Sequence, residues 1–316
     1  MVQDTTILLH LGTHKTGTTT LQQSFAAARQ ALRSRDVVFL GPGNSYPHLY
    51  SAFLTDPMIF PWNRLSGLTV DQIRDRDRKA MNELAAALDR NRGKTIILSN
   101  EYLAMLPPEQ MTALRDFLSP HGQVHAVYVY RELHSWLGSN TQQMVKAGLS
   151  SRGTSFATGL KRVGDFPLKV AQVFGLENST FLRFEDLIRE GVADTFLGHF
   201  NLPTLTEIGC TEQIANTAVS GPAVSALMVY NRDFPTGHAD RDPQEVARLM
   251  ALPGEKYRAA ALRPNDIRAY SAMRDKVQAE LGLRLAPPEA LPLLPHPHLI
   301  RLRRMAGRMK RRLLRL

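Results

Sequence analysis

The amino-acid sequence predicts an α/β fold, in which a parallel sheet is flanked by helices and followed by a helical C-terminal portion. Five short, mostly apolar segments are typical of buried strands, at residues 5–11, 36–41, 94–99, 125–130 and 180–184. Segments with helical spacing lie between them, and strands that alternate with helices form parallel sheets. From about residue 210 the strand pattern disappears, so helices and loops are expected there.

Each expected helix has its own signals. After the first strand, apolar residues recur at helical spacing at Leu21, Phe25, Ala28 and Leu32. Thr69 and Gln72 form a capping-box pattern at the start of the next helix. Two prolines begin the helical segment 107–118, and Gly148 and Gly175 are placed to end two later helices.

Composition indicates a soluble globular chain. Its 316 residues are 43% hydrophobic, which is enough for a full core. The single cysteine, Cys210, excludes an internal disulfide and a thiolate metal cage, and it suits a reducing compartment. The N-terminus lacks the pattern of a secretory signal, and no apolar run reaches the roughly 18 residues of a membrane span. We therefore expect a cytoplasmic protein, and the ten scattered histidines suggest no metal site.

The positive charge is concentrated at the C-terminus. The net charge is +10, but eight of these charges belong to residues 299–316, so the rest of the chain carries +2. Nucleic-acid binding is therefore not expected. A helix in this tail would carry apolar residues interleaved with basic ones, which suits an anionic membrane surface on the inner face of the membrane, whereas a disordered tail is the alternative. The basic residues are Arg301, Arg303, Arg304, Arg308, Lys310, Arg311, Arg312 and Arg315.

Three parts of the chain follow from these patterns. Residues 1–285 form the expected catalytic or binding domain, residues 286–298 form a proline-rich linker, and residues 299–316 form the basic amphipathic tail.

The loop after the first strand predicts an anion-binding site. The sequence LHLGTHKTGTTTLQ, residues 9–22, imitates the P-loop pattern GxxxxGK[ST], with Thr18 in place of the usual lysine and Lys15 earlier. Backbone N–H groups, a helix N-terminus and the hydroxyls of Thr16, Thr18 and Thr19 together suit a tetrahedral anion. The predicted fold is therefore P-loop-like, although glycine and threonine also form ordinary turns and caps.

Two further strand ends carry candidate functional residues. Arg131 follows the fourth strand, and Ser139 lies eight residues later, just over two helical turns, so both can face one phosphate. Glu101 follows the third strand. Ligands of such sheets collect at the carboxyl ends of the strands. The alternatives are a surface arginine with an incidental serine, and a carboxylate that only stabilises a helix start.

These motifs resemble those of the sulfotransferase superfamily that uses 3′-phosphoadenosine 5′-phosphosulfate (PAPS), in particular bacterial glycan-type members. HKTGTT at residues 14–19 is similar to the family loop PKTGTT, with His14 in place of proline. VYVYRELHSWLGS matches the second signature, a strand that ends in arginine with a serine eight residues later. The similarity extends over about residues 5–285. It implies PAPS as co-substrate, PAP as product, and Arg131 and Ser139 as ligands of the 3′-phosphate.

The resemblance also suggests how the reaction would be divided among residues. The loop residues His14, Lys15, Thr16, Gly17, Thr18 and Thr19 would bind the phosphosulfate, with Lys15 stabilising the leaving group. Glu101 is the candidate base, and His48 is a competing base or a residue that positions the acceptor. Phe184 would lie near the adenine. The expected reaction is metal-free, in-line transfer to a hydroxyl of a glycan, a glycolipid or a related acceptor.

Two other functions fit parts of the pattern. A P-loop kinase or NTPase would share the loop, but Thr18 occupies the position of its lysine. A non-catalytic, nucleotide-binding module recruited to membranes would keep the loop and depend on the basic tail.

Overall fold

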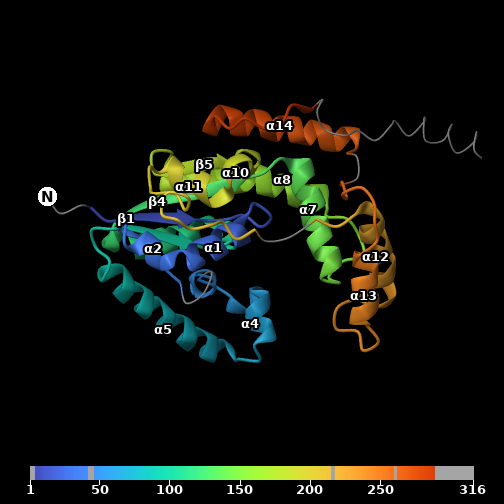
Figure 1. The fold of residues 1–316 in the computed structure, drawn as a ribbon, viewed down its shortest axis with the longest axis horizontal. Helices are drawn as coiled ribbons and strands as arrows, with labels where there is room; N and C mark the ends of the chain where they lie inside the picture. The colour runs from blue at the N-terminus through green and yellow to red at the C-terminus, as the bar shows by residue number, and fades with distance from the viewer. Residues whose placement is uncertain (1–3, 42–45, 215–217, 260–261, 289–316) are drawn as a thin grey trace, which may run out of the picture.

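The computed structural model describes residues 4–41, 46–214, 218–259 and 262–288. Its centre is a five-stranded sheet in the order β2-β3-β1-β4-β5, and every neighbouring pair is parallel (Figure 1). Helices cover both faces, so the predicted P-loop-like α/β class is confirmed. The strands are β1 (Thr6–His10), β2 (Val37–Phe39), β3 (Thr95–Ser99), β4 (Gln123–Tyr130) and β5 (Ser179–Arg183).

The helices before the C-terminal portion include most of those predicted. The capping box of Thr69 is confirmed, since its hydroxyl accepts from the Gln72 N–H and its own N–H donates to the Gln72 side chain. The helices are α1 (Thr18–Ala27), α2 (Arg29–Arg33), α3 (His48–Ser51), α4 (Pro61–Leu65), α5 (Val70–Asp89), α6 (Pro108–Leu118), α7 (Leu133–Lys146), α8 (Phe156–Val163), α9 (Asp165–Phe174), α10 (Phe184–Glu190) and α11 (Val192–His199), with 3-10 turns η1 (Pro57–Ile59), η2 (Leu103–Met105) and η3 (Ser119–His121).

Two predicted elements differ from the structure. The helix expected to continue from the first loop to Leu32 is divided into α1 and α2 at Ala28, whose ψ of 6° is not helical. The second strand is shorter than residues 36–41, because β2 is an edge strand that pairs with β3 through three residues only.

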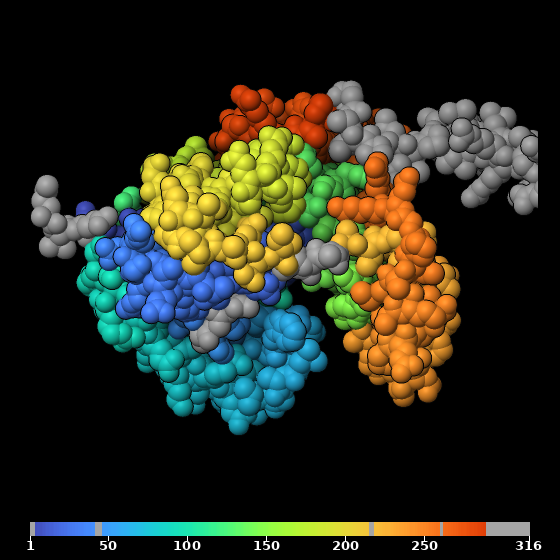
Figure 2. Space-filling model, viewed as in Figure 1, coloured from blue at the N-terminus to red at the C-terminus, as the bar shows by residue number. Residues whose placement is uncertain are grey.

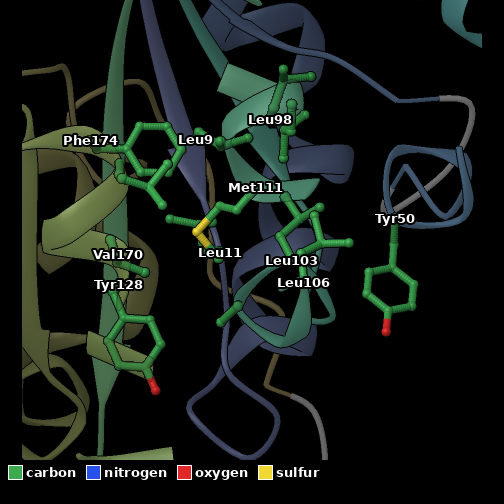
Figure 3. Packing of buried hydrophobic residues seen from close by; sticks show 14 of the residues in the cluster. Leu9, Leu11, Tyr50, Leu98, Leu103, Leu106, Met111, Tyr128, Val170 and Phe174 are labelled. Carbon is green, nitrogen blue, oxygen red and sulfur yellow. The ribbon is translucent and has the colours of Figure 1, made fainter. Parts of the chain in front are cut away.

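Alternate residues of each central strand enter two different cores, as expected for strands covered on both faces. In β1, Ile7 and Leu9 belong to the larger core, whereas Leu8 belongs to the core under α1 and α11. Figure 3 shows part of the larger core, in which Leu9 and Leu98 lie near Met111 of α6. This burial on both faces fixes β1 at the centre of the sheet.

The C-terminal portion is helical, as predicted. It contains α12 (Gly221–Asp233), α13 (Pro243–Met250) and α14 (Pro264–Leu281). A small core joins α12 and α13 to the end of α7 through Val145, Val224 and Leu249. Figure 2 shows an open cleft between this pair of helices and the side of the molecule that carries α4. Among the described residues, no helix combines the length and the apolar character needed to cross a membrane.

Candidate anion-binding site

The strand order places the site. Strand β1 lies between β3 and β4. Strands β2 and β3 lie on one side of β1, and β4 and β5 lie on the other side, so the strand order reverses direction at β1. The carboxyl end of β1 is therefore a topological switch point. The loop that follows β1 is fixed on both sides. The N–H of Val129 donates to the carbonyl of Gly12 at 3.0 Å on the β4 side, and the N–H of Ala104 donates to the carbonyl of Leu11 at 3.3 Å on the β3 side.

The backbone of this loop needs glycine. Gly12 and Gly17 have φ values of 82° and 81°, in the left-handed region that other residues rarely adopt. A Cβ on Gly12 would lie 2.7 Å from the Cα of Glu101, so the loop also passes directly beside that residue. Lys15 itself has a φ of 68°, which bends the chain back at the lysine.

The loop threonines divide into two groups. The hydroxyls of Thr16 and Thr18 both donate to the carbonyl of Thr13, at 2.5 and 3.2 Å, and both side chains are buried. Thr19 is exposed in the first turn of α1. In this conformation, the hydroxyls of Thr16 and Thr18 therefore stabilise the loop, and the hydroxyl of Thr19 is the most accessible of the three.

Lys15, Glu101 and His14 form a group of interacting polar side chains. Burial raises the pKa of Glu101, while Lys15 and Arg162 act in the opposite direction. Burial lowers the pKa of Lys15, and Glu101 partly offsets that effect. Burial, together with Arg162 and Lys15, lowers the pKa of His14 to about 3. His14 is therefore neutral at pH 7, and its Nε2 lies 3.6 Å from Oε1 of Glu101, which is neither an ion pair nor a hydrogen bond.

Arg131 lies beside the same loop. Its Nη1 donates to the carbonyl of Lys15 at 2.6 Å, and its Nε donates to the hydroxyl of Ser135 at 2.9 Å. The guanidinium lies 4.5 Å from the ring centre of Phe184, which also packs close to Gly17. Phe184 thus supports the arginine and the loop in this structure. Ser139 is half-buried on α7, one turn beyond Ser135, with no hydrogen bond of its hydroxyl among the described residues.

Arg162 was not predicted, yet it completes the group. Its Nη1 donates to the hydroxyl of Thr13 at 2.6 Å, and its guanidinium lies 5.6 Å from the ring centre of Trp136 and 5.0 Å from that of Phe166. The indole of Trp136 in turn donates to the carbonyl of His14. Arg162 comes from α8, far along the chain from the loop, and no local motif marks it.

Lys15, Arg131 and Arg162 share one property. Burial lowers the pKa of each, and within the described part of the chain none has a carboxylate oxygen within 4.0 Å. Glu101 and Glu185 act on these cations only from beyond that distance, so the burial of the positive charges is only partly offset, and a bound anion would offset it further. Lys146, on α7, is close enough to lower the pKa of Lys15 further. The arrangement can therefore bind a multiply charged anion next to a carboxylate.

His48 lies in a different environment. Its Nδ1 is 3.1 Å from Oδ1 of Asp77, and its side chain lines a pocket with Trp62 and Arg76. In the described part of the chain it makes no hydrogen bond or ion pair with Lys15 or Glu101. The structure thus brings Glu101, Lys15 and Arg131 together and places His48 in a separate pocket.

Comparisons with known proteins give little further information. No protein-family model matches this chain, and no curated protein sequence matches it. Among solved structures, a sulfotransferase from Alicyclobacillus acidocaldarius is similar with 14% identity and a TM-score of 0.44, covering 88% of this chain and 96% of that one. A chain of the PezAT toxin-antitoxin system of Streptococcus pneumoniae is similar with 11% identity and a TM-score of 0.26, covering 86% of this chain and 88% of that one. At these values neither similarity indicates an activity, so the function is inferred from the site.

Proposed function

We propose that this protein is a PAPS-dependent sulfotransferase that transfers a sulfuryl group to a hydroxyl of a glycan, a glycolipid or a related acceptor. The observation that carries the proposal is the group of three partly buried cations, Lys15, Arg131 and Arg162, which have no carboxylate partner within 4.0 Å among the described residues and surround a loop at a helix N-terminus. PAPS carries two separate anionic groups and supplies the sulfuryl group when bound.

Each anionic group of PAPS would be bound by a different cation. Lys15 and the loop N–H groups would hold the phosphosulfate, because they lie at the N-terminus of α1, where the helix dipole favours an anion. Arg131, which bonds to Ser135 of α7, would bind the 3′-phosphate together with Ser139, one turn further along that helix. Arg162 adds a positive charge beside Thr13, where it would stabilise negative charge that develops during transfer.

Glu101 would act as the general base. Burial raises its pKa, so the ionised carboxylate is a stronger base than an exposed glutamate. It would take the proton from the acceptor hydroxyl as that oxygen bonds to sulfur. Lys15 would donate a hydrogen bond to the bridging oxygen, which leaves with the 5′-phosphate when its bond to sulfur breaks. His48 makes no hydrogen bond or ion pair with Lys15 or Glu101 among the described residues, so its proposed role is to position the acceptor.

A P-loop kinase or NTPase is not favoured. Thr18 occupies the position of the lysine in that pattern, and its hydroxyl donates to the carbonyl of Thr13. A non-catalytic nucleotide-binding module would share the cations, so only a transfer assay distinguishes it from an enzyme.

The proposal is tested by transfer of labelled sulfate from PAPS to a lipid and carbohydrate extract of the source cells. We expect the purified protein to label at least one component, and Glu101→Gln to reduce the rate by about 100-fold or more, as for loss of a general base. Glu109→Gln is the matched control, because Glu109 is exposed on α6. Absence of transfer by the wild type, or full activity of Glu101→Gln, would contradict the proposal.

A further inference from the structure

A second candidate site is a pocket connected to Tyr102, the residue that follows the candidate base Glu101 in the chain. Its volume is about 300 Å³, near the lower end of the range for small-molecule sites. Its lining residues come from the segment between β2 and α5 and from α5 itself, and they are Pro47, His48, Phe60, Trp62, Asn63 and Arg76. This segment includes α4, which is labelled in Figure 1, and in Figure 2 it borders the open cleft described above.

Trp62 gives this pocket an uncovered aromatic wall. The side chain is 61% exposed, and within the described residues no other aromatic ring or cation packs on its indole. The ring is nevertheless oriented, because its Nε1 donates to the hydroxyl of Tyr102 at 3.3 Å. Tyr102 follows Glu101 in the chain, and its ring lies 4.5 Å from that of His14. The aromatic wall is therefore linked to the candidate base through Tyr102, its neighbour in the chain.

A buried carboxylate holds two of the polar side chains that line the pocket, His48 and Arg76. Asp77 is 2% exposed, and its Oδ1 accepts from Nε and Nη2 of Arg76, at 3.0 and 2.8 Å, and lies 3.1 Å from Nδ1 of His48. Nη2 of Arg76 also donates to Asn63 at 2.8 Å. Two groups that line the pocket have no partner among the described residues: Nη1 of Arg76, which is a donor, and Nε2 of His48, which accepts when Nδ1 carries the proton.

We propose that this pocket binds a single neutral pyranose ring of the acceptor, stacked on Trp62, with adjacent hydroxyls bonded to Arg76 and His48. The C–H groups on one face of a pyranose are weakly positive and suit the negative face of an indole. One donor and one acceptor match a pair of hydroxyls. The ring is neutral because the charge of Arg76 is already balanced by Asp77. That this sugar is the sulfated acceptor rests on the function proposed above, whereas its binding does not.

A lipid surface is the competing occupant of this region. Ile59 and Leu65 are also exposed, at 61% and 78%, and they lie three residues before and after Trp62, Ile59 at the end of η1 and Leu65 at the end of α4. If all three residues contacted lipid, Leu65 would contribute as much as Trp62 to the affinity for the lipid surface. If Trp62 binds a sugar, Leu65 has no role, because it does not line the pocket. Leu65→Ala is therefore the matched control for Trp62→Ala.

The test uses the full chain and saturation-transfer NMR with methyl β-glucopyranoside, methyl β-galactopyranoside and methyl β-glucuronide. We expect saturation of the ring C–H protons of at least one neutral glycoside, and weaker binding of the glucuronide. Trp62→Ala should lower the affinity for the neutral glycoside about tenfold, and Leu65→Ala should leave that affinity unchanged. The affinity for PAP, measured in parallel, should be the same in both variants, which also shows that they are folded.

Several outcomes would overturn this inference, and others separate it from the proposed function. Absence of glycoside binding, preference for the glucuronide, or equal loss in Trp62→Ala and Leu65→Ala would each contradict a neutral sugar at this pocket. Binding of the chain to phosphatidylcholine vesicles that both variants abolish would identify a lipid surface instead. If PAP binds and glycosides do not, the sulfotransferase proposal stands without this inference. If Trp62-dependent glycoside binding occurs without PAP binding, the sugar site stands and the sulfotransferase proposal fails.

Discussion

Burial shifts the pKa values of Lys15 and Glu101 in opposite directions, and this determines how the site titrates. Burial favours the neutral form of both groups, so it raises the pKa of the glutamate and lowers that of the lysine. Their mutual attraction, and that of Arg162 for Glu101, limits both shifts. An anion on Lys15 would further favour its charged form.

The rate of sulfuryl transfer should therefore have a narrow, bell-shaped pH dependence. Glu101 must be ionised to accept a proton, so kcat/KM should fall as the pH decreases through its raised pKa. Lys15 must be protonated, so kcat/KM should fall again as the pH rises through its lowered pKa. In Lys15→Arg, the fall at high pH should move upward, because arginine stays charged. An acid limb near the ordinary glutamate pKa of about 4.3 would contradict the role of Glu101.

His10 should make the fold sensitive to mild acid. It is fully buried at the end of β1, and burial lowers its pKa to about 4. Below the unfolded pKa of about 6.5, the unfolded chain binds a proton that the folded chain binds only near pH 4, so the free energy of unfolding decreases as the pH falls through this window. This residue alone should account for about 2 kcal/mol between pH 7 and 5.

Urea denaturation at pH 7 and 5 measures this effect. Other groups also titrate, so the informative quantity is the difference between the wild type and His10→Asn. The loss of stability on acidification should be about 2 kcal/mol smaller in the variant. An equal loss in both proteins would show that His10 is not neutral in the folded chain.

At the scale of elements, the sequence predicts most of the framework. Strands such as β3 and β4 are continuous apolar runs, and the capping box of Thr69 is a local signal, so both can be predicted from a few adjacent residues. The division of the first helix at Ala28 has no comparable signal. Arg162 and Trp62 were not predicted because their importance arises from contacts with Thr13 and Tyr102, which lie elsewhere in the chain.

The loop after β1 passes close to Glu101, and the tightness of this packing can be tested by substitution of Gly12. Gly12→Ala should be destabilising for two reasons, its φ of 82° and the 2.7 Å approach of the new Cβ to the Cα of Glu101. Gly67→Ala is the matched control, because Gly67 has a φ of 70° but no atom within 4 Å of the new Cβ. Urea denaturation should show a loss larger by about 1–3 kcal/mol in Gly12→Ala, and an equal loss would exclude tight packing of the loop.

At the scale of the whole molecule, the parallel sheet brings the site residues together at the carboxyl ends of its strands, and the C-terminal helices pack beside this end of the molecule. The ends of β1, β3 and β4 supply Lys15, Glu101 and Arg131, while α12 and α13 pack on the end of α7. The cleft beside α4 thus lies between the two parts of the chain (Figure 2). The basic tail, residues 299–316, lies outside the described residues, and its proposed role at an anionic membrane surface depends on sequence alone.

Removal of the tail tests that role. The full chain should sediment with vesicles containing phosphatidylserine, and the attraction should weaken at high salt because it is electrostatic. A chain ending at residue 298 should remain free while keeping its affinity for PAP. Equal sedimentation of the two proteins, or equal binding to uncharged vesicles, would contradict an electrostatic anchor in the tail.

Calorimetric titration with PAP, 5′-AMP and ATP in the presence of EDTA tests the central claim most directly. The account predicts that PAP binds more tightly than either competitor without Mg²⁺, because Lys15 and Arg131 hold two separate phosphates. Lys15→Ala should weaken the binding of PAP. Arg131→Ala should remove the preference for PAP over 5′-AMP, because loss of a charge-assisted contact lowers the affinity for PAP by about tenfold or more. The control Arg92→Ala, at the opposite end of β3, should change nothing. PAP binding no tighter than ATP, or unaffected by Arg131→Ala, would contradict the account.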